Sequence, residues 1–234
     1  MHEVTEGTVH VETLTDEELK VLIGQAGVSV TPHLDALAPG QRAMAEEAAF
    51  RSLSARGVAS RPDIRAVVTL REAARTRVSV VRTTGGRQSF WYGHVVDGVL
   101  LVEQVSQDGM HHFALADATR LGDLLVRAAV HDLAGDASGP GVTWANGPEG
   151  DGPPSVVERL GEPWIRADVT LCHPADPDPA PQVLFTGPGG CWWADTDWCA
   201  GAPVARPMTA VGLRSKLQQL AGPLRETPSF LMVH

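Results

Sequence analysis

Residues 89–115 read Ser89-Phe-Trp-Tyr-Gly-His-Val-Val96, Asp97-Gly98, Val99-Leu-Leu-Val-Glu-Gln-Val105, Ser106-Gln-Asp-Gly109 and Met110-His-His-Phe-Ala-Leu115. Three runs rich in β-branched and aromatic residues are separated by two Asp-Gly pairs. Gly after Asp supplies the positive φ that tight hairpin turns require. The stretch therefore predicts three antiparallel strands joined by short turns.

The segments on either side complete a unit of strands and a covering helix. Upstream, Arg77-Val-Ser-Val-Val-Arg82 alternates as a half-buried strand and turns at Gly85-Gly86. Downstream, apolar residues recur at i, i+3, i+4 and i+7, which is one stripe of a helix: Leu121, Leu124, Leu125 and Ala128. We expect antiparallel strands over 77–115 with a helix over 117–133 packed on them.

A similar unit follows near the C-terminus, with expected strands over 164–208 and a covering helix over 209–222. Within it, Gly189-Gly-Cys-Trp-Trp-Ala-Asp195 resembles Asp97-Gly-Val-Leu-Leu-Val-Glu103. The likeness is either an internal duplication or a chance match between two segments of the same type. A duplication would give one continuous antiparallel sheet built by two halves.

Helices are expected before the first strands. Thr15 and Glu18 have the spacing of a capping box and begin the first helix, which follows a short strand near Thr8 to Val11. The second helix covers 41–56 and ends at Gly57, which suits a left-handed cap. A third helix begins at Pro62.

These patterns predict an α+β protein with an antiparallel β-sheet and flanking helices; if the two similar segments are a duplication, a pseudo-twofold axis relates two meander-plus-helix units. The expected N-terminal half is 1–135, with helices first and the meander after them. A Gly/Pro-rich linker follows at 136–154, and the C-terminal half at 155–234 has a short helix, strands and a covering helix.

Composition and charge exclude several classes of protein. The chain has 234 residues, of which 43% are hydrophobic and 20% charged, so it can form a packed core. Its net charge of -9 argues against coating nucleic acid. No apolar run approaches the ~20 residues that span a bilayer. Three Cys without paired spacing fit a reducing compartment, and we expect a cytoplasmic protein without a membrane segment.

The candidate reactive residues do not form a recognisable catalytic or metal-binding motif. Cys172, Cys191 and Cys199 lack the paired spacing of a structural zinc site, so we expect core cysteines, no metal and no cofactor. His111 and His112 are adjacent in a strand, so they point to opposite faces, and we expect both at the surface. No catalytic residue is predicted.

Tryptophans of the second half give the main functional hint. Trp192 and Trp193 lie on opposite faces of one strand, and one of them should be in the core. Trp193 shares its face with Asp195, so we expect Trp193 to be exposed. Together with Trp198, it would anchor a surface that binds another protein.

An alternative hypothesis is a DNA-binding regulator. Three helices followed by a Gly-turned hairpin have the order of a winged-helix module. The Arg-rich segment 61–87 would supply its DNA contacts, through Arg61, Arg65, Arg71, Arg75, Arg82 and Arg87. Few Asn, Gln or Ser residues accompany these Arg to read base edges. An enzyme of unrecognised type is the third class.

The arrangement resembles the EspG family, the cytosolic chaperones of ESX (type VII) secretion in actinobacteria. The likeness rests on Leu14-Thr-Asp-Glu-Glu-Leu-Lys-Val-Leu22, on Leu53-Ser-Ala-Arg-Gly-Val58, on the strands from Arg77 to Val105 and on the two similar halves, and it covers most of residues 8–224. It implies a quasi-twofold fold and non-catalytic binding of a helical secretion substrate. We expect the chain to be shorter than its relatives, and no substrate-contact residue matches one by one.

Overall fold

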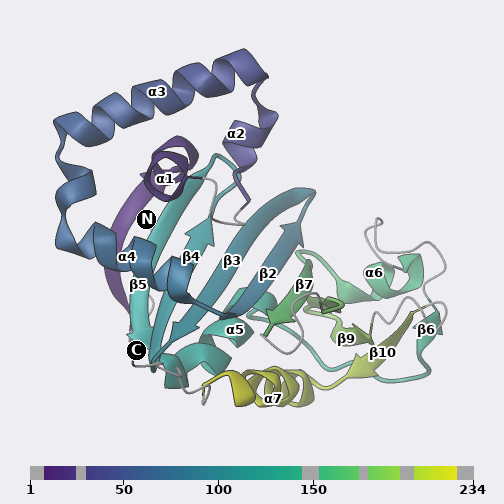
Figure 1. Ribbon diagram of the computed structural model, residues 1–234. Helices are drawn as coiled ribbons and strands as arrows, with labels where there is room; N and C mark the ends of the chain where they lie inside the picture. Colours follow the sequence, from purple (N-terminus) through teal and green to yellow (C-terminus); the bar gives the residue numbers. More distant parts are fainter. Residues whose placement is uncertain (1–7, 25–29, 144–152, 174–178, 196–202, 226–234) are drawn as a thin grey trace.

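A computed structural model describes residues 8–24, 30–143, 153–173, 179–195 and 203–225. Its centre is one ten-stranded sheet in which every neighbouring pair of strands is antiparallel (Figure 1). In their order across the sheet, the strands are β1 (Val9–Thr15), β5 (Met110–Asp117), β4 (Val99–Val105), β3 (Arg87–Val96), β2 (Thr76–Thr84), β7 (Ile165–Cys172), β8 (Gln182–Gly187), β9 (Gly190–Asp195), β10 (Val204–Met208) and β6 (Val142–Thr143). The expected α+β class with an antiparallel sheet is confirmed.

The strand order is symmetrical about the central pair of β2 and β7. In this pair Val80 lies opposite Val169. Moving outward, β3, β4, β5 and β1 on one side correspond to β8, β9, β10 and β6 on the other. The turn Asp97-Gly98 and the turn at 187–190 therefore occupy corresponding places, as the sequence likeness between them predicted.

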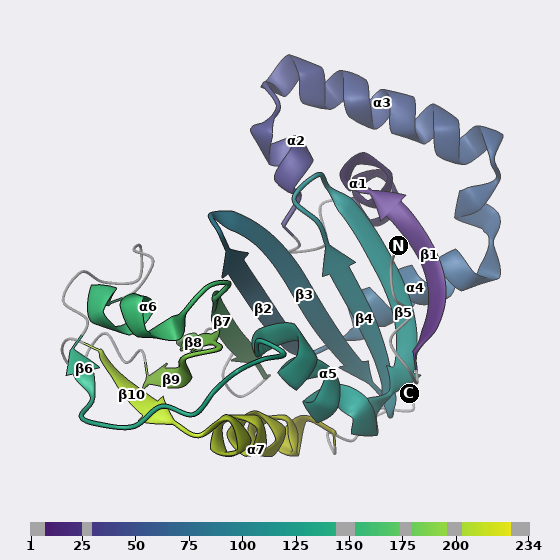
Figure 2. The same cartoon turned by 180° about the vertical axis from the view of Figure 1, so that it is seen from behind.

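The helices cover both faces of the sheet. On one face of the N-terminal strands lie α1 (Asp16–Ile23), α2 (Pro32–Ala36), α3 (Pro39–Ala55), the short turn η1 (Val58–Ser60) and α4 (Pro62–Ala73). On the opposite face, α5 (Leu121–Ala129), which follows the turn η2 (Ala118–Arg120), packs beside α7 (Ala210–Ala221), which precedes η3 (Pro223–Arg225) (Figure 2). The short helix α6 (Pro154–Leu160) covers the other face of β8 and β9.

These layers enclose three apolar cores. The largest lies between the sheet and the helices α5 and α7, and includes Val80, Val169, Leu125 and Leu217. A second core lies under α1, α3 and α4, and the third lies under α6. Strands β4, β8 and β9 are buried on both faces, whereas in the central strand β2 only alternate residues are fully buried.

Local turn chemistry was predicted correctly. Asp97 and Gly98 have φ values of 51° and 79°, the pair of positive values that a type I′ turn requires. Thr15 and Glu18 form the expected capping box, and Gly57 adopts the left-handed conformation after α3. Residues 32–36 form a further short helix, α2, between the first two expected helices.

The expected linker is only partly described. Residues 144–152 lie outside the described residues, and the division into two halves stays a prediction. The beginning of the segment is tied to the C-terminal strands: the Ala137 amide donates to the Met208 carbonyl at 2.9 Å. The Asp136 carboxylate accepts from the Ala210 amide at 2.8 Å and so holds the start of α7.

Candidate functional site

The tryptophan surface expected on the second half does not form as predicted. Trp192 and Trp193 do lie on opposite faces of β9, but each is only 2% exposed. Trp193 packs in the core under α7 with the Lys216 ammonium 3.9 Å from its ring centroid, while Trp192 packs under α6. The expected exposure of Trp193 is wrong because both faces of this strand are covered. Trp198 lies outside the described residues.

The Arg-rich segment is divided among several surfaces. Arg71 belongs to α4 and is buried between this helix and the sheet, whereas Arg82 points to the opposite face of the sheet. Arg61 is paired with Glu12 at 2.6 Å. The remaining residues, exposed on α4, after α4 and at the hairpin tip, are Arg65, Arg75 and Arg87.

The winged-helix arrangement is also wrong. The hairpin of β2 and β3 would be the wing, but β2 pairs with β7 and β3 pairs with β4, so the hairpin lies inside the sheet. A wing needs strands at an edge, free to reach along a DNA groove. The Arg residues of the segment therefore do not gather on one DNA-reading face.

The cysteines do not form a metal site within the described residues. Cys191 is buried, its thiol donates to the Gly135 carbonyl at 2.8 Å, and burial raises its pKa to about 11. Cys172 is half-buried in β7, and Cys199 lies outside the described residues. The described part of the chain contains no group of three or more His, Cys, Asp or Glu side chains placed to hold a metal ion. It also contains no helix long and apolar enough to cross a membrane.

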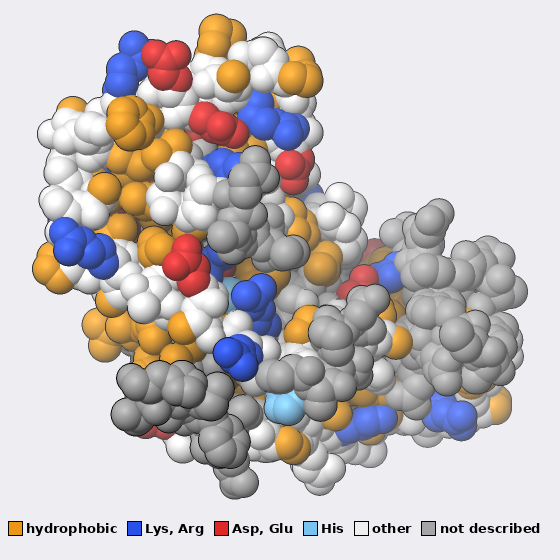
Figure 3. Space-filling view, in the orientation of Figure 1, with side chains coloured by type: hydrophobic (Ala, Val, Ile, Leu, Met, Phe, Trp, Pro, Cys, Tyr) orange, Lys and Arg blue, Asp and Glu red, His pale blue; other side chains and the backbone are white. Residues whose placement is uncertain are grey.

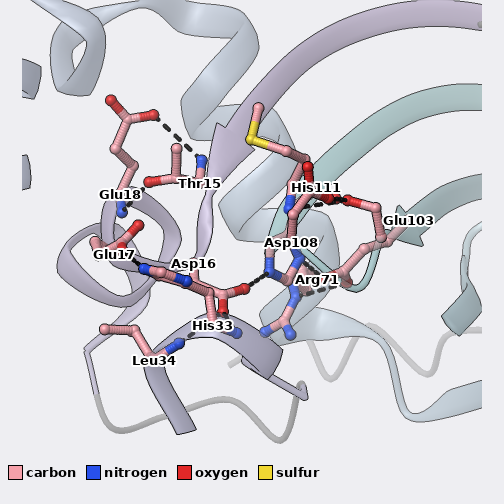
Figure 4. A network of polar contacts seen from close by, with 12 residues as sticks. Thr15, Asp16, Glu17, Glu18, His33, Leu34, Arg71, Glu103, Asp108 and His111 are labelled. Atoms are coloured by element: carbon pink, nitrogen blue, oxygen red, sulfur yellow. Dashed lines mark hydrogen bonds and ion pairs between the residues drawn. The ribbon is translucent and has the colours of Figure 1, made fainter. Parts of the chain in front are cut away.

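A buried polar network joins the first helices to the sheet (Figure 4). Because Thr15 caps α1, Asp16 occupies the first helical position, and its side chain is fully buried. One carboxylate oxygen of Asp16 accepts from the backbone amides of His33 at 2.7 Å and Leu34 at 3.1 Å, at the start of α2. The other oxygen accepts from His111 Nε2 at 2.7 Å.

The network continues from His111 into the sheet. His111 Nδ1 donates to Glu103 Oε1 at 2.8 Å. The second oxygen of Glu103 accepts from Arg71 Nε on α4 and from His94 Nε2 on β3, both at 3.0 Å. The network thus connects α1, three strands and α4 through buried ionisable side chains, and joins α2 through two backbone amides.

The hydrogen bonds fix the charges of the two histidines. Both ring nitrogens of His111 face carboxylates, which only accept, so the ring carries two protons and a positive charge. Burial opposes this charge, but the hydrogen bonds to Asp16 and Glu103 outweigh it and raise the His111 pKa. Burial lowers the pKa of His94, and its Nδ1 has no hydrogen-bond partner among the described residues, so His94 is neutral.

The carboxylate of Glu103 is the common partner in the network. Burial alone would raise its pKa, but hydrogen bonds from His111 and His94 and the charge of Arg71 hold the Glu103 pKa well below its usual range. Two carboxylates therefore balance one guanidinium and one imidazolium. Because both nitrogens of His111 are occupied by carboxylates, the ring is not placed to act as a general base.

The surface position expected for His111 is therefore wrong. His112, on the opposite face, is half-exposed and its Nδ1 lies 3.0 Å from the Thr13 hydroxyl. The sequence contains a signal for the network, because Glu103 is a single carboxylate within an apolar strand run. A charge at such a position needs a buried partner.

Two cavities open on the described surface. One, of about 620 Å³, lies on the α5 face of the N-terminal strands. The other, of about 360 Å³, lies between α1, α3 and α4 and is called the helical groove below. Its apolar lining comes from all three helices: Val21, Leu22, Phe50, Leu53, Ile64 and Val68.

The helical groove carries hydrophobic side chains that are open to solvent. Phe50 on α3 is 60% exposed, and hydrophobic side chains gather beside α3 and α4 in Figure 3. In the whole of α3, only Ala49 and Leu53 are buried. This helix of 17 residues packs mainly on α1, and near its start Arg42 Nε donates to the Leu34 carbonyl at 3.1 Å.

The fold and these surfaces define an α+β protein with one antiparallel sheet and two open grooves. No protein-family model matches the chain, and no curated protein matches it in sequence. Among solved structures, the chain is similar to the type VII secretion system chaperone EspG5 of Mycobacterium tuberculosis, determined in complex with a PE25–PPE41 dimer. The two chains are 12% identical with a TM-score of 0.48, over 88% of this chain and 94% of that chain.

Proposed function

We propose that the chain is a non-catalytic protein-binding module, a chaperone of type VII secretion that binds a helical segment of a secretion substrate. The helical groove between α1, α3 and α4 carries this proposal. An exposed apolar groove between helices suits the apolar face of an amphipathic partner helix. Apolar side chains spaced one helical turn apart on that partner would enter the groove. The sequence resemblance to the EspG family supports the same class of partner.

Phe50 is the anchor that the geometry favours. It lines the groove and is 60% exposed, so it loses solvent contact only when a partner covers it. Truncating an aromatic anchor of this kind commonly costs ~2 kcal/mol, about thirtyfold in affinity. Because Phe50 contributes little to the core, its removal should leave the fold intact.

The test is affinity capture from the source cell with partners identified by mass spectrometry. The wild-type chain should recover a helical secreted protein, and Phe50→Ala should lose most of that recovery. Met44→Ala is the matched control, because Met44 is 65% exposed on the same helix but does not line the groove. Recovery of DNA, or equal capture by the wild type and Phe50→Ala, would contradict the proposal.

A further inference from the structure

The larger cavity, called the sheet groove below, exists because α5 is too short to cover its face of the sheet. A helix of 9 residues is ~14 Å long, whereas strands β1 to β2 extend over ~20 Å at their usual spacing. Figure 2 shows α5 crossing the lower parts of β3 and β4, where Leu100 and Val102 pack against it, while β1 and the upper part of β5 are not covered by a described helix. The sheet forms the floor of the groove and α5 forms one wall.

The charges that line the sheet groove are all basic. Arg82 from β2 and Arg127 from α5 line it, together with His10 and His112. No Asp or Glu occurs among its described lining residues, although the chain as a whole has a net charge of -9. The groove is therefore a local basic site on an acidic protein.

Neither arginine has a carboxylate partner among the described residues. Arg127 is exposed at the rim and Arg82 is half-buried, and the described part of the chain forms no ion pair with either. Burial lowers the pKa of Arg82, and the charge of Asp132 opposes this shift without cancelling it. A partly desolvated guanidinium without a partner gains free energy when an anion approaches it.

The rest of the lining combines apolar and aromatic residues with five uncharged polar ones, Thr8, Thr13, Ser89, Gln104 and Ser106. Trp91 forms part of the floor and is 6% exposed, beside Val102, Ala114 and Leu124. The volume of about 620 Å³ falls within the range of small-molecule sites. Such a lining accommodates a hydrophobic body, and the two arginines would hold a negatively charged group.

We propose that the sheet groove binds a small amphipathic organic anion, with its apolar body on Trp91 and its carboxylate or sulfonate toward Arg82 and Arg127. This site is separate from the helical groove. It shares none of that groove's lining residues, so each proposal stands or fails independently of the other.

A pair of matched probes tests the proposal. The anionic probe is 1-anilinonaphthalene-8-sulfonate, and the neutral probe is N-phenyl-1-naphthylamine, which has the same rings without the sulfonate. Fluorescence titration of the full chain should give saturable binding that is tighter for the anionic probe. Arg82→Gln and Arg127→Gln should each weaken the anionic probe about tenfold and change the neutral probe less than twofold.

Arg65→Gln is the control, because Arg65 lines the helical groove and should not affect either probe in the sheet groove. Melting curves must show that the variants remain folded. Unchanged binding of the neutral probe shows that the apolar floor of the sheet groove is intact. Equal binding of both probes, or anionic affinity unchanged in both variants, would overturn the proposal. Displacement of the anionic probe by a tetraglutamate peptide at lower concentration than by dodecanoate would also overturn it, and would assign the groove to an acidic protein segment.

Discussion

Replacement of Glu103 by Gln should destabilise the protein more than any surface change of the same kind. The Glu103 side chain is fully buried and accepts hydrogen bonds from Arg71, His94 and His111. Gln keeps the shape but removes the charge, and its amide N–H groups then face groups that also donate. Arg71 would remain buried beside no described carboxylate.

The expected loss follows from the cost of an uncompensated buried charge. Breaking a buried ion pair by removing one partner costs ~3–5 kcal/mol. That is a large share of the ~5–15 kcal/mol that stabilises an ordinary domain. For a chain of this length it corresponds to a fall of roughly 6–20 °C in the melting temperature.

Urea unfolding of the purified chain measures the effect. Glu47→Gln is the matched control, since the Glu47–Arg51 pair is about 70% exposed on both sides and should contribute less than ~1 kcal/mol. A double-mutant cycle with Arg71→Met should show strong coupling, because the second change removes the unpaired charge. A loss below ~1 kcal/mol for Glu103→Gln, or additivity within ~0.5 kcal/mol, would refute the reasoning.

Three further predictions concern His111, Trp193 and Cys191. The folded-state pKa of His111 is raised above its ordinary value of 6.5, so its contribution to stability is complete below pH 6.5 and is lost as the pH rises through the folded pKa. The unfolding free energy of the wild type should therefore fall more steeply above pH 6.5 than that of His111→Gln. The control variant His112→Gln should keep the wild-type slope. Parallel slopes for the wild type and His111→Gln would contradict this prediction. Trp193→Ala should cost ~3–5 kcal/mol of stability, measured by urea unfolding, because the ring lies in the core under α7. A loss below ~1 kcal/mol would show that the Trp193 ring is not packed in the core. Cys191 should resist iodoacetamide in the folded protein at pH 8 and react in urea, since burial suppresses its thiolate; rapid native labelling at this position in peptide mass spectra would show that the site is open.

The sheet could be predicted from sequence because its determinants are local. The positive φ at Asp97 and Gly98 comes from the two residues themselves, and strand alternation correctly placed Trp192 and Trp193 on opposite faces. Which face is covered is not a local property. The helix over Trp193 begins at Ala210, and the helix over Trp192 precedes β7, so exposure depended on packing between distant segments.

Glu103 within an apolar strand indicated a buried charge, but its partners in the network could not be predicted, for the same reason. His111 reaches Asp16, 95 residues earlier in the chain, and only the folded arrangement of α1 on the sheet brings them together. The Arg residues of segment 61–87 also have different environments in the folded protein. Arg71 and Arg82 look alike in the sequence, but one is neutralised by Glu103 in the interior and the other faces the sheet groove.

The two outer strands limit how a partner can be recognised. A partner that adds a strand needs a long, regular edge of free backbone groups. At one edge β6 contributes two residues, and at the other the ladder of β1 shifts its register between His10 and Glu12. Backbone pairing with another chain is therefore poorly supported at either edge. Recognition falls instead to side-chain surfaces, which can discriminate one partner sequence from another in a way that backbone groups, identical in every chain, cannot.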